Sequence, residues 1–185
     1  RGFRVTGVDL SAGMLEQARA DALAAGVDVE LIRANACSWR REGAFEAAIC
    51  LCEGAFTLLG SGDDPIEHDL AILANIHASL KPGGWLVLAA LNALRWVRAI
   101  APEDVEASRA DILSMVSATD VESDGPTGKV AVTVHERYYV PTELRLMCRI
   151  VGLDVVRIAS GTAGPLGRRD LQLDEMEVLL VARRP

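Results

Sequence analysis

An acidic residue, Asp9, directly follows the first apolar run of the chain, a strand predicted over Phe3–Val8. Ser11 comes two residues later and is a typical helix N-cap. At the carboxyl end of a strand, a carboxylate can accept hydrogen bonds from both hydroxyl groups of a ribose, because two oxygens match two adjacent hydroxyls. An acid at this point also stabilises a helix N-terminus through the helix dipole. Both interpretations of Asp9 stay open at this stage.

Two more polar side chains follow apolar runs farther along the chain. Glu53 follows the run Ala47–Cys52, and Asn92 follows the run "WLVLAAL". Parallel strands gather their ligands at their carboxyl ends, so Glu53 can bind a cationic group or accept a proton, and Asn92 has the same position on the next strand. The alternative for Glu53 is a helix cap for the segment "GAFTLL".

A third group of polar and aromatic side chains lies in the segment "HERYY" of a predicted strand over 129–140. Alternation places His135, Arg137 and Tyr139 on one face of that strand and Tyr138 on the other. In the structural interpretation, the aromatic rings pack the strand and Arg137 pairs with Glu143. His68, which we expect to be exposed, and His77 are assigned no role.

Strands and helices alternate in the first half of the chain. Further strands are predicted over Val29–Ile32, Ala47–Cys52 and 85–91, and helices are predicted to begin after the caps Ser11 and Asp64. The first helix is expected to end at Gly26. Expected inward-facing residues are Met14, Ala18 and Ala22 in the first helix, with Leu15 alongside, and Ile66, Leu70, Leu73, His77 and Leu80 in the second.

The second half changes character. It contains a short helix over 103–109, two strands over 111–122 and 129–140 joined by the turn "SDGPTG", a helix from Thr142 to Ile150 that Gly152 terminates, and two closing strands. We predict one α/β domain over 1–185, with a doubly wound, mostly parallel sheet, an antiparallel C-terminal strand and a hairpin inserted over 110–140.

Composition narrows the function further. The 185 residues have a formal net charge of −7 and no cluster of Lys and Arg, which argues against nucleic-acid binding. No run of ~18 apolar residues suggests a membrane span, and no signal-peptide pattern opens the chain. The four cysteines lack zinc-site spacing, so we expect buried thiols, no metal and a cytoplasmic protein.

Five segments in order resemble the S-adenosylmethionine-dependent methyltransferases of the Rossmann-like class. They are "VTGVDLSAGMLEQAR", "RANACSW", "FEAAICLCEGAFTLLG", "LKPGGWLVL" and the closing pair "GLDVVRI" and "MEVLLVARR". The segments "LNALRWVR", "GPTGKV" and "ERYYVPTELRLM" are similar to the branch that acts on small molecules. The resemblance implies S-adenosylmethionine as cofactor and a small-molecule methyl acceptor as partner, with no nucleic acid or membrane.

The resemblance also implies residue roles for the cofactor. Asp9 would hold the ribose hydroxyls, Leu10 would pack near the adenine, and the N–H of Ala36 would face an adenine ring nitrogen. Asn35 stands where the family has an acid that accepts a hydrogen bond from the adenine amino group; its alternative role is that of a turn residue. The carbonyl of Leu51 would face the ammonium of the methionine part.

For the acceptor, the resemblance places Arg137 and Tyr139 beside the methylated molecule, with Glu53 and Asn92 as further candidates. No catalytic residue is assigned, because a sulfonium is already a good leaving group and the enzyme mainly aligns the reactants and excludes water.

The chain departs from the family at its beginning. The first strand and the glycine-rich loop of the family would precede residue 1, and the "GSG" at 60–62 follows the wrong strand to replace that loop. The absent strand would lie between the strands at 3–8 and 47–52, which then cannot pair at the usual ~4.8 Å. We expect a fragment of a longer enzyme. The alternatives are a non-catalytic binding domain with the same fold and, in another class, a nicotinamide-dependent oxidoreductase.

Overall fold

The computed structural model describes residues 2–52, 54–125, 128–162 and 166–185. Its helices are α1 (Ala12–Ala24), α2 (Pro65–Ser79), α3 (Ala93–Trp96), α4 (Pro102–Glu106) and α5 (Pro141–Ile150). Its strands are β1 (Thr6–Asp9), β2 (Glu30–Arg33), β3 (Phe45–Cys50), β4 (Leu58–Leu59), β5 (Leu80–Asn92), β6 (Ala110–Asp111), β7 (Val116–Gly125), β8 (Gly128–Tyr139), β9 (Asp154–Ser160) and β10 (Glu177–Arg183). Glu53 lies outside the described residues.

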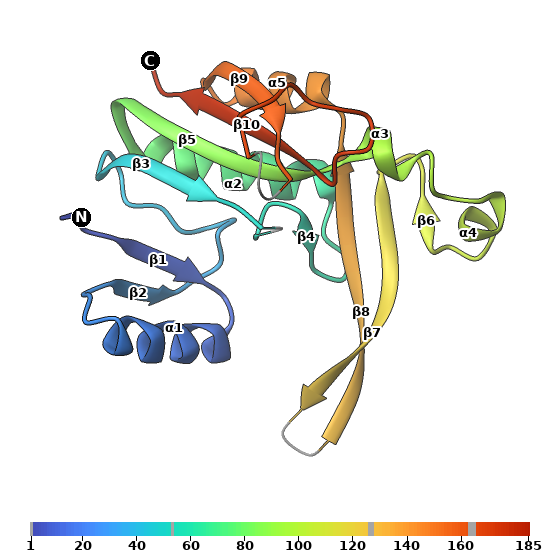
Figure 1. Ribbon diagram of the computed structural model, residues 1–185, viewed down its shortest axis with the longest axis horizontal. Coiled ribbons are helices and arrows are strands. Elements are labelled where there is room, and N and C mark those ends of the chain that lie inside the picture. Colours follow the sequence, from blue (N-terminus) through green and yellow to red (C-terminus); the bar gives the residue numbers. More distant parts are fainter. Residues whose placement is uncertain (1, 53, 126–127, 163–165) are drawn as a thin grey trace.

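The strands form two sheets (Figure 1). The strands β1 and β2 pair in parallel and make a sheet of their own. The main sheet has the order β6-β7-β8-β5-β10-β9, with β3 paired to β5 and β4 to β8. In its doubly wound part, β3 pairs in parallel with β5, and β9 runs in the same direction as β5 because both are antiparallel to β10, so the predicted mostly parallel sheet is confirmed there. The hairpin adds the antiparallel pairs that make the whole sheet mixed. The predicted antiparallel C-terminal strand is confirmed by β10, which runs antiparallel to both its neighbours.

Strand β1 is the edge of the small sheet that lies nearer to β3 of the main sheet, and the two strands point the same way (Figure 1). In the described part of the chain, β1 pairs only with β2 and β3 only with β5, so no ladder joins the two sheets. This agrees with the expectation that these two strands do not pair directly. The carboxyl ends of β1 and β3 nevertheless face the same side of the molecule.

Both predicted helix caps are present. The side chain of Ser11 accepts a hydrogen bond from the N–H of Met14, and Asp64 accepts from the N–H groups of Ile66 and Glu67. Gly26 follows α1 with φ +63°, a backbone conformation that glycine adopts without steric cost.

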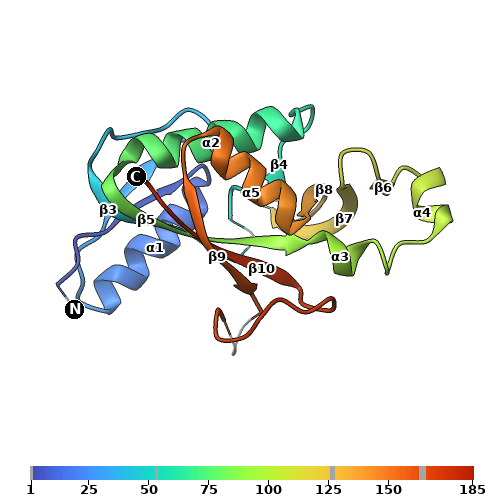
Figure 2. The ribbon, with the colours of Figure 1, turned by 90° about the horizontal axis from the view of Figure 1, so that it is seen from above.

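The core lies between the main sheet and the helices α2 and α5, which share one side of β5 (Figure 2). Its fully buried members include Leu73 of α2, Leu86 and Leu88 of β5, Leu144 of α5 and Leu180 of β10. In the view of Figure 2, α1 lies on the opposite side of β5. No helix in the part of the chain described here has both the length and the apolarity to cross a membrane.

The predicted inner faces of the helices are partly wrong. Met14 is 61% exposed, and Leu15 is the buried residue of α1, which has only the small β1–β2 sheet to cover. In α2, Ile66 is 56% exposed whereas Asp69 is buried. His68, which was expected to be exposed, is largely buried as well. Its Nδ1 lies 2.9 Å from Oδ1 of the buried Asp69.

The inserted segment is a long hairpin with one break in its first strand. Residues 110–111 form the separate strand β6, and a turn that includes Met115 at φ +59° precedes β7. The strands β7 and β8 then pair from Val116–Arg137 to Gly125–Gly128. Figure 1 shows the far half of the hairpin extending away from the rest of the molecule.

Candidate functional site

The pairing of β1 with β2 brings four of the predicted cofactor residues together. Asp9 is opposite Arg33 in the parallel register, and the carbonyl of Asp9 accepts a hydrogen bond from the N–H of Ala34 at 3.1 Å. Asp9 and Leu10 at the end of β1 therefore lie beside Asn35 and Ala36, which follow β2. The carboxyl end of a parallel sheet is where such folds bind nucleotides.

Only one of the two carboxylate oxygens of Asp9 has a hydrogen-bond partner among the described residues. Its Oδ1 accepts a hydrogen bond of 2.7 Å from the N–H of Ser11, and Oδ2 has no hydrogen-bond partner among the described residues. Leu10 is 62% exposed next to it, and Nε of Arg33 holds the Leu10 carbonyl at 3.1 Å. One carboxylate oxygen and one apolar side chain are thus available at the end of β1.

Asn35 forms a turn at the end of β2. Its Oδ1 accepts from the N–H of Cys37 at 2.8 Å, and its carbonyl accepts from the N–H groups of Ser38 and Trp39. The interpretation of Asn35 as a turn residue is therefore confirmed, and its contact with adenine stays a prediction. In the same turn, the N–H of Ala36 donates to no described residue, while the Ala36 carbonyl accepts from Asn75 of α2 at 2.9 Å.

Leu51 belongs to the other sheet, just after β3. Its carbonyl accepts no hydrogen bond from the described residues. The chain bends sharply here: Cys52 has φ +57°, and a Cβ on Gly54 would lie 3.3 Å from the Leu51 carbonyl oxygen. The structure thus gives Leu51 an available carbonyl at the carboxyl end of β3.

Asn92 is buried at the end of β5, where it holds neighbouring backbone. Its Oδ1 caps α3 by accepting from the N–H of Leu94, and its Nδ2 donates to the carbonyl of Glu175 at 3.0 Å. The side chain is 1% exposed. These contacts give Asn92 a structural role, and a contact with the acceptor remains a prediction.

Arg137 and Tyr139 share one face of β8, as the alternation predicts, and both are buried. Arg137 donates to Asp69 of α2, to the Pro65 carbonyl at 2.8 Å and to Oε1 of Glu143 at 2.5 Å. The pairing of Arg137 with Glu143 is therefore confirmed.

The Tyr139 hydroxyl donates to the Phe56 carbonyl at 2.6 Å, and the Tyr139 ring stacks on the Phe56 ring with centroids 4.9 Å apart. Burial raises the pKa of Tyr139 far above its ordinary value. Tyr138, on the opposite face, stacks on Trp96 with centroids 4.7 Å apart. The aromatic residues thus pack the base of the hairpin, as the structural interpretation predicts.

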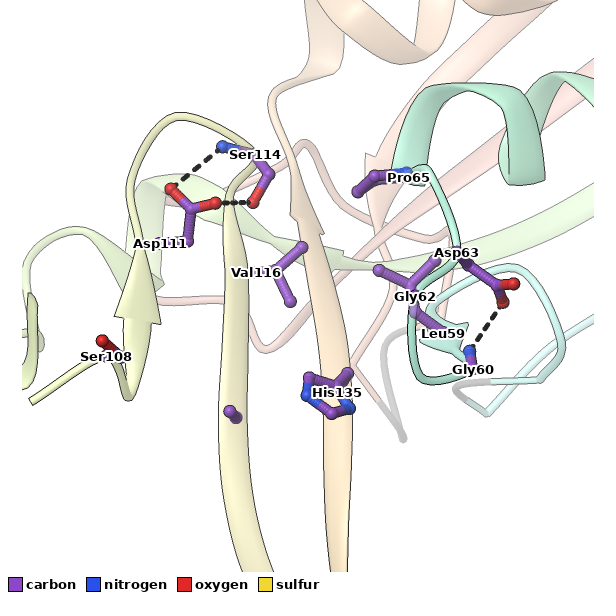
Figure 3. A pocket seen from close by; sticks show the side chains of 11 residues that line it. Leu59, Gly60, Gly62, Asp63, Pro65, Ser108, Asp111, Ser114, Val116 and His135 are labelled. Atoms are coloured by element: carbon purple, nitrogen blue, oxygen red, sulfur yellow. Dashed lines mark hydrogen bonds between the residues drawn. The ribbon is translucent and has the colours of Figure 1, made fainter.

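The hairpin also forms one wall of a cavity of about 310 Å³ that the sequence did not reveal (Figure 3). Val116 and Ala118 of β7 and His135 of β8 face it from one side. The loop between β4 and α2, with Asp63, faces it from another. Ser108, Asp111 and Ser114 from the segment around β6 complete the polar lining. Of these polar residues, only His135 is indicated by the sequence, because the others come together through the docking of distant segments.

Fold and geometry define a class: a Rossmann-like α/β domain with available polar groups at the carboxyl ends of β1, β2 and β3. Comparison with known proteins narrows it. Residues 1–84 match the family model described as "Methyltransferase domain". The ubiquinone biosynthesis O-methyltransferase of Burkholderia thailandensis is 28% identical over 191 residues, which span 99% of this chain and 70% of that protein.

Solved structures of methyltransferases share this fold. The CcbJ methyltransferase from Streptomyces caelestis matches 100% of this chain and 80% of its own with a TM-score of 0.76 at 22% identity. The glycopeptide N-methyltransferase MtfA, complexed with S-adenosylmethionine, matches 100% of this chain and 73% of its own with a TM-score of 0.61 at 17% identity. Residues 1–84 thus match a methyltransferase domain, and the chain as a whole has the fold of S-adenosylmethionine-dependent methyltransferases of the Rossmann-like class.

Proposed function

We propose that this chain binds the adenosine part of S-adenosylmethionine through Asp9, Leu10, Asn35 and Ala36 and takes part in methyl transfer to a small organic acceptor. The observation that carries the proposal is the available Oδ2 of Asp9 at the carboxyl end of β1. All the predicted cofactor residues also fall within the 84 residues that match the methyltransferase family model.

The residues present fit this cofactor at three points. The free oxygen of Asp9 can accept hydrogen bonds from ribose hydroxyls, and the free N–H of Ala36 can donate to an adenine ring nitrogen. The carbonyl of Leu51 can accept from the ammonium of the methionine part. Asn35 fits less well than the acid typical of the family, because Oδ1 already closes a turn and carries no charge. We therefore expect adenine to be held mainly by the backbone.

When bound, the cofactor supplies an electrophilic methyl group on a sulfonium. The protein then has to hold the acceptor in line with the methyl and sulfur atoms and exclude water. A small-molecule acceptor is supported by the relatives, since the names of MtfA and of the ubiquinone biosynthesis enzyme each refer to a small organic product.

The test is titration of the chain with S-adenosylhomocysteine by isothermal titration calorimetry, comparing the wild type with Asp9→Asn. Asparagine retains an oxygen for the N–H of Ser11 but replaces the free carboxylate oxygen by an NH₂ group, which cannot accept a ribose hydroxyl. A hydrogen bond to a charged group contributes about 1.5–3 kcal/mol, so we expect binding weaker by about 10- to 100-fold. The matched control is Asp28→Asn, an exposed carboxylate in the loop before β2.

Two results would contradict the proposal. One is an unchanged affinity for S-adenosylhomocysteine in Asp9→Asn. The other is saturable binding of NADH in place of S-adenosylhomocysteine, which would favour an oxidoreductase. Binding of neither ligand by the correctly folded chain would support the alternative of a non-catalytic domain.

A further inference from the structure

The outer half of the hairpin, residues 119–122 and 128–134, has two chemically different faces. In the antiparallel register of β7 and β8, Val121 is opposite Val132. Paired residues of antiparallel strands point to the same side of the ladder, and side chains alternate along each strand. One face therefore consists of Thr119, Val121, Val130, Val132 and Val134, and we call it the valine face.

Within the outer half, every charged side chain lies on the opposite face. Nζ of Lys129 donates to Oε2 of Glu122 at 2.8 Å, and the Thr133 hydroxyl donates to Oδ1 of Asp120 at 2.7 Å. These four residues alternate with the members of the valine face along the two strands. The valine face itself carries no charge in this part of the hairpin.

The valine face is open to water in the single chain. Val121, Val130 and Val132 are 40%, 47% and 43% exposed, and Figure 1 shows this half of the hairpin extending away from the rest of the molecule. A two-stranded ribbon on its own is marginally stable in water, and an apolar face with polar surroundings can mark an interaction site. A surface that covers the valines would therefore stabilise the hairpin.

The distribution of charge favours a second copy of this chain as that surface. In a two-fold interface the same patch lies on both chains, so residues near the axis meet their own counterparts, and a charge there would meet a like charge, which is destabilising. The chain has a formal net charge of −7, yet Asp120 and Glu122 lie on the face that points away from the valines. The valine face is thus compatible with its own copy, whereas a charged partner would find no opposite charge on it.

The same face continues towards the base of the hairpin. Leu58 of β4 is opposite Glu136 of β8, which lies on the side of Val132 because it is an even number of positions away. Leu58 is 42% exposed. When two hairpins lie antiparallel, the tip of each reaches the base of the other, so Leu58 lengthens the apolar contact. The two Glu136 side chains would then lie about 26 Å apart, at opposite ends, for a strand rise of about 3.3 Å per residue.

We propose that the valine face joins two copies of this chain, with the outer halves of two hairpins packed face to face and antiparallel about a two-fold axis near the Val121–Val132 pair. The contact comprises few side chains, and interfaces below about 1,200 Å² are typical of weak association. We therefore expect a reversible dimer with a dissociation constant between about 1 μM and 1 mM. No residue of the proposed cofactor site takes part in this contact.

The test is sedimentation velocity of the wild-type chain between about 1 μM and 1 mM, beside two variants with a lysine at neighbouring positions of β8. Val132→Lys places the charge on the valine face. Ala131→Lys is the matched control, because Ala131 is exposed on the opposite face and pairs in register with Glu122. We expect similar dissociation constants for the wild type and Ala131→Lys, and association at least about tenfold weaker for Val132→Lys.

A mixture of variants separates loss of the contact from loss of the fold. Val132→Lys and Val132→Glu should each be monomeric at concentrations where the wild type is dimeric. Their equal mixture should form a mixed dimer, because opposite charges then meet across the axis. A hairpin that had unfolded in the variants would not recover on mixing.

Any of three observations would overturn the proposal. A wild type that stays monomeric at every concentration would leave the valine face to a different partner. Dimerisation of Val132→Lys at wild-type strength, or loss of the dimer in Ala131→Lys, would place the contact on another surface. An equal mixture of Val132→Lys and Val132→Glu that remains monomeric would refute the two-fold, face-to-face arrangement.

Discussion

Substitution of Arg137 by Met tests whether this residue serves the fold or the acceptor. The guanidinium links α2, β8 and α5 through Asp69, the Pro65 carbonyl and Glu143. Its side chain is 3% exposed and that of Asp69 is fully buried. In the variant, the Asp69 carboxylate would remain buried without a cation, with the His68 ring and the Tyr139 hydroxyl as its neighbours.

The magnitude follows from this burial. Removing one partner of a buried ion pair costs about 3–5 kcal/mol, because an uncompensated charge stays inside the protein. For a domain of this size, 1 kcal/mol shifts the melting temperature by about 2–4 °C, so we expect a decrease of about 6–20 °C. The double variant Asp69→Leu/Arg137→Met removes both charges and should recover most of the loss.

The assay is urea unfolding followed by tryptophan fluorescence, with exposed Arg157→Met on β9 as the control. A free energy of unfolding for Arg137→Met within about 1 kcal/mol of wild type would refute the structural interpretation, since the expected range begins at about 3 kcal/mol. It would then favour the prediction that Arg137 contacts the acceptor. A double variant no more stable than Arg137→Met would refute the reasoning about the unpaired carboxylate.

Three further predictions concern other parts of the molecule. Hydrogen bonds from an arginine and a threonine lower the pKa of Glu30 to about 2, so its contribution to the stability of the β1–β2 sheet is complete above about pH 4.5 and lost as the pH falls towards 2. Hydrogen exchange of β1 amides should show that loss in the wild type and not in Glu30→Gln. Tyr139→Phe leaves the buried carbonyl of Phe56 without its donor, and urea unfolding should show a loss of about 1–3 kcal/mol. Cys148 is fully buried with its pKa raised to about 12, whereas Cys52 is exposed; peptide mapping after iodoacetamide at pH 8 should show modification of Cys52 alone of these two.

The sequence predicted what local signals determine. The caps Ser11 and Asp64 gave the starts of α1 and α2, since a cap acts within three residues of the helix. The inner faces were less predictable. The charge of Asp69 in α2 predicts an exposed residue. It is buried because it pairs with Arg137, which lies 68 positions away in the sequence. The mixed character of the sheet likewise depends on which strand edges the hairpin joins.

The candidate site divides in the same way. Asp9 could be predicted because strand, acid and cap follow each other in the sequence. The cavity beside the hairpin could not be predicted, because its lining residues come from the β4–α2 loop, the segment around β6 and both strands of the hairpin. For Asn92 the sequence was misleading. Its position at the end of β5 suggested a contact with a ligand, but its side-chain amide is hydrogen-bonded to the backbone of Leu94 and Glu175.

The arrangement of the sheets also determines how the two ends of the proposed cofactor site are connected. Asp9 and Ala36 are carried by the β1–β2 sheet and Leu51 by the main sheet, and no strand pairing joins these sheets in the described residues. The connection is made by α2. Its Asn75 holds the Ala36 carbonyl at 2.9 Å, and the Ser79 hydroxyl and carbonyl hold the N–H groups of Arg41 and Ala44 at 3.0 Å.

The helix α2 therefore has two roles in this molecule. Along its length it anchors the segment after β2 that carries the residues predicted to face adenine, and at its N-terminus it borders the cavity with Pro65. Because one helix contacts both places, the distance between the predicted adenosine site and the cavity is set by α2 more directly than by either sheet. The predicted adenosine site and the cavity thus share one positioning element, although different segments of the chain line them.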